Sequence, residues 1–128
     1  MLTIGLAQFS VLPGNAAANT AKMKKYIHEA VKKGCDLIVF PELSVPGYFI
    51  GDNWDQPDYI NECVRMGEEI RELSQDITVI FGNVATEENR MNPDGRPRKY
   101  NAMFIAQKGA FISPGRSPYP FYIKTLLP

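Results

Sequence analysis

The sequence has few of the residues that build metal centres and disulfide frameworks. It contains two cysteines, Cys35 and Cys63, and one histidine, His28, among 128 residues. Two thiols and one imidazole cannot form a disulfide scaffold or a four-ligand zinc site. We therefore expect no bound metal, both cysteines packed as small apolar side chains, and His28 on the surface.

The chain also lacks an excess of charge of one sign and a long hydrophobic run. Its 14 Lys and Arg balance 14 Asp and Glu. Nucleic acids and anionic membranes bind basic surfaces that displace counterions, so we expect neither as a partner. No apolar run reaches membrane-spanning length, and the first residues, Met1 to Thr3, lack the basic region of a signal peptide. These absences favour a cytoplasmic protein.

The length allows one modest domain, and no repeat or linker divides it. Apolar residues make up 45% and charged residues 22% of the chain, which is typical of globular proteins. The last ten residues, Tyr119–Pro128, form an apolar run, whereas natural C-termini are usually polar. We therefore expect the sequence to be a piece of a longer chain.

Four apolar segments predict strands, and two segments with helical spacing predict helices. The predicted strands are Leu2–Gln8, Asp36–Phe40, Ile77–Gly82 and Tyr100–Gln107, and the predicted helices run from an N-cap at Asn15 to about Lys33 and from Asp58 to Ser74. Strand, helix and strand joined by short connections indicate an α/β fold. The Asp36–Phe40 strand is apolar on both faces, which indicates that other layers cover it.

Two further patterns predict packing and connections. In the first helix, an apolar stripe that faces the core is predicted at Met23, Ile27, Ala30 and Val31. Residues Thr86–Lys99 are polar, and Asn92–Gly95 within them is a strong turn signal.

Glu42 is the most informative polar residue. It follows an apolar strand and Pro41, and ligands in open α/β sheets bind beyond the carboxyl ends of strands. Partial desolvation there is expected to raise its pKa toward the range of a general base. From its position alone, an exposed loop glutamate or a helix-capping acid remains the commoner case.

Lys124 interrupts the apolar run Tyr122–Leu127. Such a lysine commonly extends to solvent, and the functional alternative is a fixed cation that faces a developing oxyanion beside a carboxylate. Asn101 opens a predicted strand and is expected to satisfy a turn rather than contact a ligand. The residues alone therefore indicate an α/β domain with a candidate Glu/Lys site and no nucleophile.

Five ordered segments carry a resemblance to a known family. The segments are Ile4–Gln8, Gly34–Leu43, Gly47–Tyr48, Tyr100–Ala102 and Tyr122–Pro128. Together they resemble the nitrilase (carbon–nitrogen hydrolase) superfamily, and the last two are most similar to the amino-terminal glutaminase domains of glutamine-dependent NAD synthetases. The resemblance implies an α/β fold, the N-terminal half of a nitrilase-type αββα sandwich. Residues 1–128 would be a carbon–nitrogen hydrolase domain truncated after the lysine motif.

The resemblance also implies roles for three residues. Glu42 would be the general base, Lys124 would stabilise the tetrahedral intermediate, and Tyr48 would line the glutamine pocket. The nucleophilic cysteine of the family belongs to a later strand end, beyond Lys124. We do not transfer its role to Cys35 or Cys63.

The implied reaction is hydrolysis of the side-chain amide of glutamine, which needs no cofactor. The ammonia would pass to a synthetase domain, absent here, which uses ATP and Mg²⁺ to amidate deamido-NAD. A stand-alone amidase or carbamoylase acting on another small amide is one alternative. A non-catalytic truncated form that acts through contacts with a partner is another. Domains of the family commonly assemble, so a homo-oligomer is expected.

Because the nucleophile is missing, the 128-residue chain alone is predicted to hydrolyse no glutamine. Release of ammonia or glutamate by the purified chain, measured against a blank, tests this. Turnover that is abolished by Glu42→Gln would contradict it.

Overall fold

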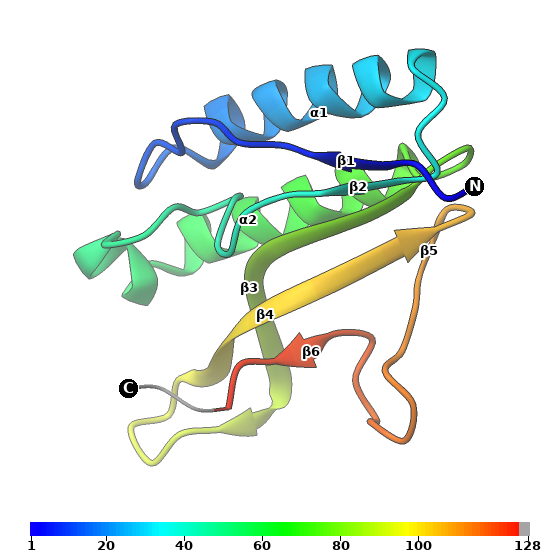
Figure 1. The fold of residues 1–128 in the computed structure, drawn as a ribbon. Coiled ribbons are helices and arrows are strands. Elements are labelled where there is room, and N and C mark those ends of the chain that lie inside the picture. The colour runs from blue at the N-terminus through cyan, green and yellow to red at the C-terminus, as the bar shows by residue number, and fades with distance from the viewer. Residues whose placement is uncertain (126–128) are drawn as a thin grey trace.

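A six-stranded mixed sheet with two helices against one of its faces makes up residues 1–125, the part that the computed structural model describes (Figure 1). The elements in chain order are β1 (Ile4–Leu6), α1 (Ala16–Lys32), β2 (Leu37–Val39), a 3-10 helix η1 (Gly51–Asp55), α2 (Pro57–Glu72), β3 (Thr78–Met91), β4 (Pro97–Gln107), β5 (Ala110–Phe111) and β6 (Tyr122–Ile123). The predicted α/β fold is confirmed. The end of the predicted lysine motif, 126–128, lies outside the described residues.

The sheet combines a parallel and an antiparallel part. The β1, β2 and β3 strands are parallel neighbours, whereas β4 pairs antiparallel with β3, β5 and β6. The β3 strand therefore joins the two parts, since it pairs with β2 on one side and with β4 on the other.

The α1 helix begins and ends as predicted. The Asn15 side chain accepts a hydrogen bond from the Ala18 amide at 3.1 Å, and Gly34 ends the helix with a φ of +74°. Met23 and Ile27 are buried, but Val31 is 40% exposed, so the prediction of its burial is wrong. At 100° per residue, Val31 lies beyond the edge of the stripe that Met23 and Ile27 define.

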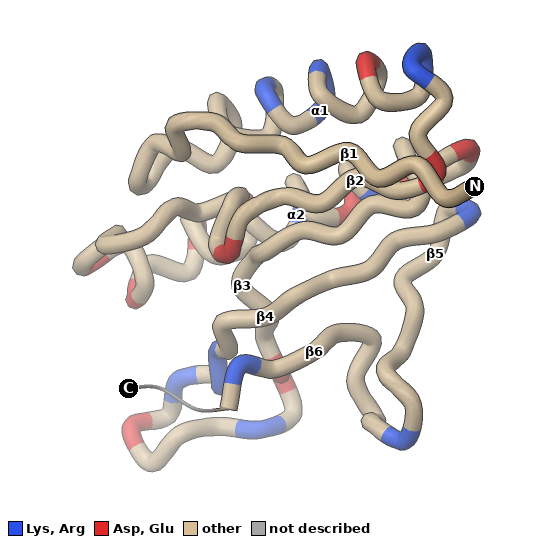
Figure 2. The backbone as a smooth tube through the Cα atoms, in the orientation of Figure 1, with Lys and Arg blue, Asp and Glu red and all other residues tan. Residues whose placement is uncertain are grey.

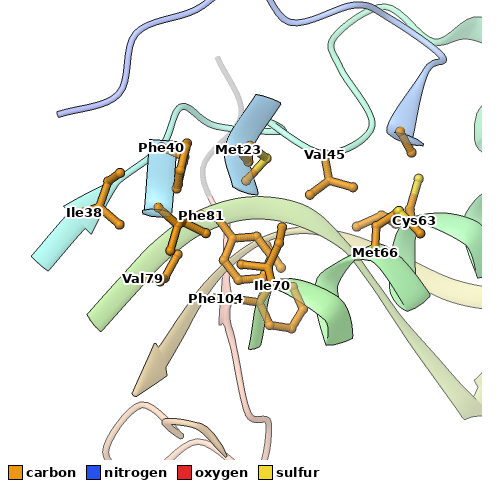
Figure 3. Packing of buried hydrophobic residues seen from close by; sticks show 14 of the residues in the cluster. Met23, Ile38, Phe40, Val45, Cys63, Met66, Ile70, Val79, Phe81 and Phe104 are labelled. Atoms are coloured by element: carbon orange, nitrogen blue, oxygen red, sulfur yellow. The ribbon is translucent and has the colours of Figure 1, made fainter. Parts of the chain in front are cut away.

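The core lies between the helices and the sheet face that they cover (Figure 3). From α2, Cys63 and Ile70 are completely buried, in agreement with the predicted packing of Cys63. Phe81 of β3 and Phe104 of β4 stack with ring centroids 5.5 Å apart. Because large aromatic rings bury much apolar area, this pair fixes β3 and β4 beneath α2.

The turn predicted at Asn92–Gly95 is confirmed, with the Gly95 amide donating to the Asn92 carbonyl at 2.9 Å, but the strands on either side of it are longer than predicted. The β3 and β4 strands stay paired out to Met91 and Pro97, with a register shift after Glu87, and only a short turn joins them. Polar residues pair as well as apolar ones when a hairpin has water on both faces, so its sequence carries no alternation. Figure 2 shows charged residues along this hairpin and on the outer side of α1, and almost none on the central strands.

The opposite face of the sheet is apolar, and no helix of residues 1–125 covers it (Figure 1). Side chains alternate along each strand, so Ile38 and Val79 are buried under the helices while Leu37 and Ile80 are only half-buried. Leu6 of β1 is 76% exposed. The layer that the sequence predicts on this second face is therefore absent from the described residues.

Gly82 of β3 lies directly beneath the turn that carries Glu42. A Cβ added there would stand 2.8 Å from the Glu42 carbonyl carbon and would contact the Leu43 amide nitrogen even more closely. Because both are backbone atoms, neither can move aside without displacing the turn.

Gly82→Ala is therefore predicted to lower the free energy of unfolding by about 1–3 kcal/mol or more. Urea denaturation of the purified chain measures this. Gly5→Ala on β1 is the matched control, since its nearest neighbour would be the Cys35 Sγ at 3.6 Å, an ordinary contact. Equal stability of the two variants would contradict the prediction.

Candidate active site

Glu42 lies on a turn that is fastened to β3. Pro41 ends β2, and the chain then turns through Leu43, whose φ is +49°. The Ser44 hydroxyl donates to the Gly82 carbonyl at 3.2 Å and accepts from the Gly82 amide at 3.3 Å, while the Val45 amide donates to the same carbonyl at 3.2 Å. Glu42 is therefore not a free loop residue, because the turn beneath it is held by several hydrogen bonds.

Lys124 reaches Glu42 from the other end of the chain. The pairing of Ile123 in β6 with Ala102 in β4 places Lys124 beside Asn101, whose carbonyl accepts a hydrogen bond from the Lys124 amide at 3.0 Å. The Lys124 Nζ lies 2.8 Å from the Glu42 Oε1, across a separation of 82 residues. The Lys124 ammonium thus lies beside a carboxylate, the arrangement that the functional alternative for this lysine requires.

Asn101 belongs to the same cluster, and the expectation that it satisfies a turn is wrong. Its Nδ2 donates to the Glu42 Oε1 at 2.6 Å. The prediction failed because Asn101 is inside a strand that begins earlier, at Pro97, rather than at a strand start. The signal that could have found it is the Tyr-Asn-Ala motif itself, which lies within the family resemblance.

Tyr48 is the third group around Glu42. Burial and the neighbouring Glu42 raise the pKa of the Tyr48 phenol to about 12, so the hydroxyl keeps its proton. Its ring is partly exposed and lies beside Phe49, at a centroid distance of 6.2 Å. A protonated phenol next to the carboxylate can donate a hydrogen bond there or to a bound polar group.

The pKa of Glu42 moves opposite to the expected direction. Hydrogen bonding to Lys124, then to Tyr48 and Asn101, lowers it from 4.5 to about 2, although desolvation opposes this. The position of Glu42 after a strand predicted only its desolvation. The hydrogen-bond donors that lower its pKa come from other segments of the chain, whose distance from Glu42 one local pattern does not give. Glu42 is therefore an ionised carboxylate at neutral pH, able to accept a proton.

The Glu42 and Lys124 side chains open into a pocket of about 320 Å³ on the uncovered face of the sheet. Its walls are mainly apolar and include Val39, Ile80 and Met103. Neither cysteine lines it. Cys63 is buried on the helix side, where desolvation raises the pKa of its thiol to about 12, and Cys35 is partly buried.

Residues 1–125 hold no cluster of three or more His, Cys, Asp and Glu that could bind a metal. They also form no helix long and apolar enough to cross a membrane.

The lowered pKa makes the stability contribution of Glu42 dependent on pH. A group whose pKa falls on folding stabilises the fold above its unfolded pKa and loses this contribution as the pH falls toward the folded value. For Glu42 that range runs from 4.5 down to about 2.

The difference in free energy of unfolding between the wild type and Glu42→Gln is therefore predicted to shrink as the pH is lowered from 7 to 3. Urea denaturation at each pH measures it. The same comparison in a Lys124→Met background is the control, where the pH dependence should be much weaker. A difference that stays constant or grows on acidification would contradict the assignment.

Comparison with known proteins places this chain in a family. The carbon-nitrogen hydrolase family model matches residues 3–117. The glutamine-dependent NAD(+) synthetase of Acinetobacter baylyi is 34% identical over 110 residues, which cover 85% of this chain and 19% of that protein. An aliphatic nitrilase of Rhodococcus rhodochrous is 28% identical over 120 residues, covering 86% of this chain and 31% of that protein.

Solved structures show the same fold. The glutamine-dependent NAD+ synthetase of Acinetobacter baumannii, in complex with ADP, superposes with a TM-score of 0.75 at 32% identity, over 98% of this chain and 21% of that one. An amidase of Nesterenkonia AN1 from the nitrilase superfamily superposes with a TM-score of 0.76 at 19% identity, over 98% of this chain and 44% of that one. The sheet and helix layer thus correspond to the predicted half of a nitrilase-type αββα sandwich.

The chain spans about a fifth of the length of the NAD synthetases that it matches. The family model nevertheless covers most of residues 1–128. The chain belongs to the carbon–nitrogen hydrolase family.

Proposed function

We propose that this chain is the amino-terminal part of the glutaminase domain of a glutamine-dependent NAD synthetase. The observation that carries the proposal is the 2.8 Å pair between Lys124 Nζ and Glu42 Oε1, which opens into the pocket. The similarity to two NAD synthetases at above 30% identity supports the choice of glutamine over other amides.

In this proposal Glu42 acts as the general base. Its carboxylate takes the proton of a cysteine thiol that a later part of a longer protein supplies, and the thiolate attacks the amide carbon of glutamine. Glu42 then gives that proton to the amide nitrogen, the C–N bond breaks, and ammonia leaves. A water molecule, deprotonated by Glu42, attacks the thioester, and glutamate is released with the thiol restored.

Lys124 would stabilise the negative charge that develops on the amide oxygen in each tetrahedral intermediate. A preorganised donor of this kind is worth roughly 3–4 kcal/mol. The same cation holds the pKa of Glu42 low at rest. When Lys124 turns its charge toward the oxyanion, the pKa of Glu42 rises, so the carboxylate becomes a better base as the reaction needs it.

Tyr48 would line the substrate pocket beside these two groups. Because the pKa of its phenol is raised to about 12, Tyr48 keeps its proton at neutral pH and can donate a hydrogen bond to a polar group of the substrate. The proposal needs no metal or cofactor at this site. The ammonia would serve a synthetase domain that uses ATP and Mg²⁺, in a cytoplasmic homo-oligomer.

A stand-alone amidase or carbamoylase of the nitrilase superfamily is the second candidate function. The similarity to the aliphatic nitrilase along 86% of this chain favours it. A small aliphatic amide would then replace glutamine, with Glu42 and Lys124 in unchanged roles.

The full product of the gene that encodes this chain is predicted to release ammonia from glutamine. Glu42→Gln and Lys124→Ala should each lower kcat/KM by roughly 100-fold or more, because one removes the base and the other the oxyanion donor. The exposed pair of Glu29 and Lys33, also 2.8 Å apart, provides the matched controls Glu29→Gln and Lys33→Ala.

Full activity of the control variants is expected. Hydrolysis of a small aliphatic amide but not of glutamine would favour the second candidate. Unchanged glutamine hydrolysis in both site variants would exclude the proposed roles of Glu42 and Lys124.

A further inference from the structure

The two oxygens of Glu42 differ in their surroundings. Oε1 accepts both the Lys124 Nζ at 2.8 Å and the Asn101 Nδ2 at 2.6 Å. A carboxylate oxygen has two lone pairs, so these two donors occupy Oε1. The other oxygen, Oε2, has two lone pairs of its own, so it retains capacity for a proton even though the Tyr48 phenol also lies beside the carboxylate.

Asn101 contacts both members of the pair. Its side chain donates to Glu42, and its main-chain carbonyl accepts from the Lys124 amide at 3.0 Å. The residue is set in the middle of β4, opposite Val84 of β3 and next to the buried Ala102. A paired central strand is rigid, so Asn101 offers a fixed reference for both groups.

The turn that carries Glu42 is held by the same β3–β4 pair of strands. It is fastened to Gly82, which stands opposite Met103 in the pairing of β3 with β4. The Glu42 backbone and the Asn101 amide are thus anchored two residue pairs apart in one hairpin, at Gly82 opposite Met103 and at Val84 opposite Asn101.

We propose that Asn101 is a positioning residue that fixes Oε1 of Glu42, so that Oε2 is the oxygen that takes and returns the proton. The inference rests on the proposed function for the identity of that proton. It assigns Asn101 a task distinct from that of Lys124, because an uncharged amide cannot neutralise an oxyanion as a cation does but can orient a carboxylate.

A purely structural amide bond occurs on the same strand and provides the control. Gln107 lies on the same face of β4, six residues on, and its Nε2 donates to the Thr78 hydroxyl at 3.0 Å. Gln107 does not line the Glu42 pocket. Gln107→Ala therefore removes a comparable hydrogen bond without touching Glu42.

The test is a ¹³C NMR titration of the purified chain labelled at the glutamate side-chain carboxyl carbons, with Glu42 assigned through Glu42→Gln. In Asn101→Ala the pKa of Glu42 is expected to rise by roughly 0.5 to 1 pH unit, the effect of losing one hydrogen bond. In Asn101→Asp, which keeps the size of the side chain, the rise should be larger because a second carboxylate faces the first. Gln107→Ala should leave the pKa unchanged.

Values for both Asn101 variants equal to that of the wild type would overturn the inference. Asn101→Asp keeps the test readable if the alanine variant unfolds. The titration requires no turnover, so it is read independently of the proposed function. A raised pKa in a protein that hydrolyses no amide would leave the positioning of Glu42 intact and reject only the reaction.

Discussion

The antiparallel pairing of β3 with β4 holds the two ends of the candidate site together. Gly82 of β3 anchors the turn of Glu42, and Ala102 of β4 pairs with Ile123, which places Lys124. Glu42 follows β2 in the parallel part of the sheet, and Lys124 follows β6 in the antiparallel part. The β3–β4 register gives them a common frame, so the ion pair depends on hydrogen bonds that neither residue makes itself.

The pair lies on the sheet face that α1 and α2 leave uncovered, where both side chains are 38% exposed. Water there weakens the attraction between the charges. A substrate, or any layer that packs over the apolar walls of the pocket, would exclude that water and strengthen each electrostatic contact. The strength of the Glu42–Lys124 attraction therefore depends on what covers this exposed apolar face.

Signals from neighbouring residues predicted the helices and most of the strands, but they did not predict contacts between segments that are distant in the sequence. The cap at Asn15 and the glycine at Gly34 fix α1 through neighbouring residues alone. The turn at Asn92–Gly95 was predicted, but the full length of the strands on either side of it was not, because neither face of the hairpin is buried enough to impose an alternating pattern. The pKa of Glu42 was predicted in the wrong direction, since burial can be inferred from one segment whereas the donors Lys124 and Asn101 come from others. The family resemblance named Glu42 and Lys124, but not the contact of Asn101 with them.

In the proposed reaction Glu42 and Lys124 act as one unit. A double-mutant cycle on amide hydrolysis by the full gene product, comparing Glu42→Gln, Lys124→Met and the double variant, measures this directly. Groups that act as a unit give strongly non-additive losses, so the double variant should be no more than a few-fold slower than the slower single variant. Losses that multiply in the double variant would show that the two residues act independently, and would contradict the account.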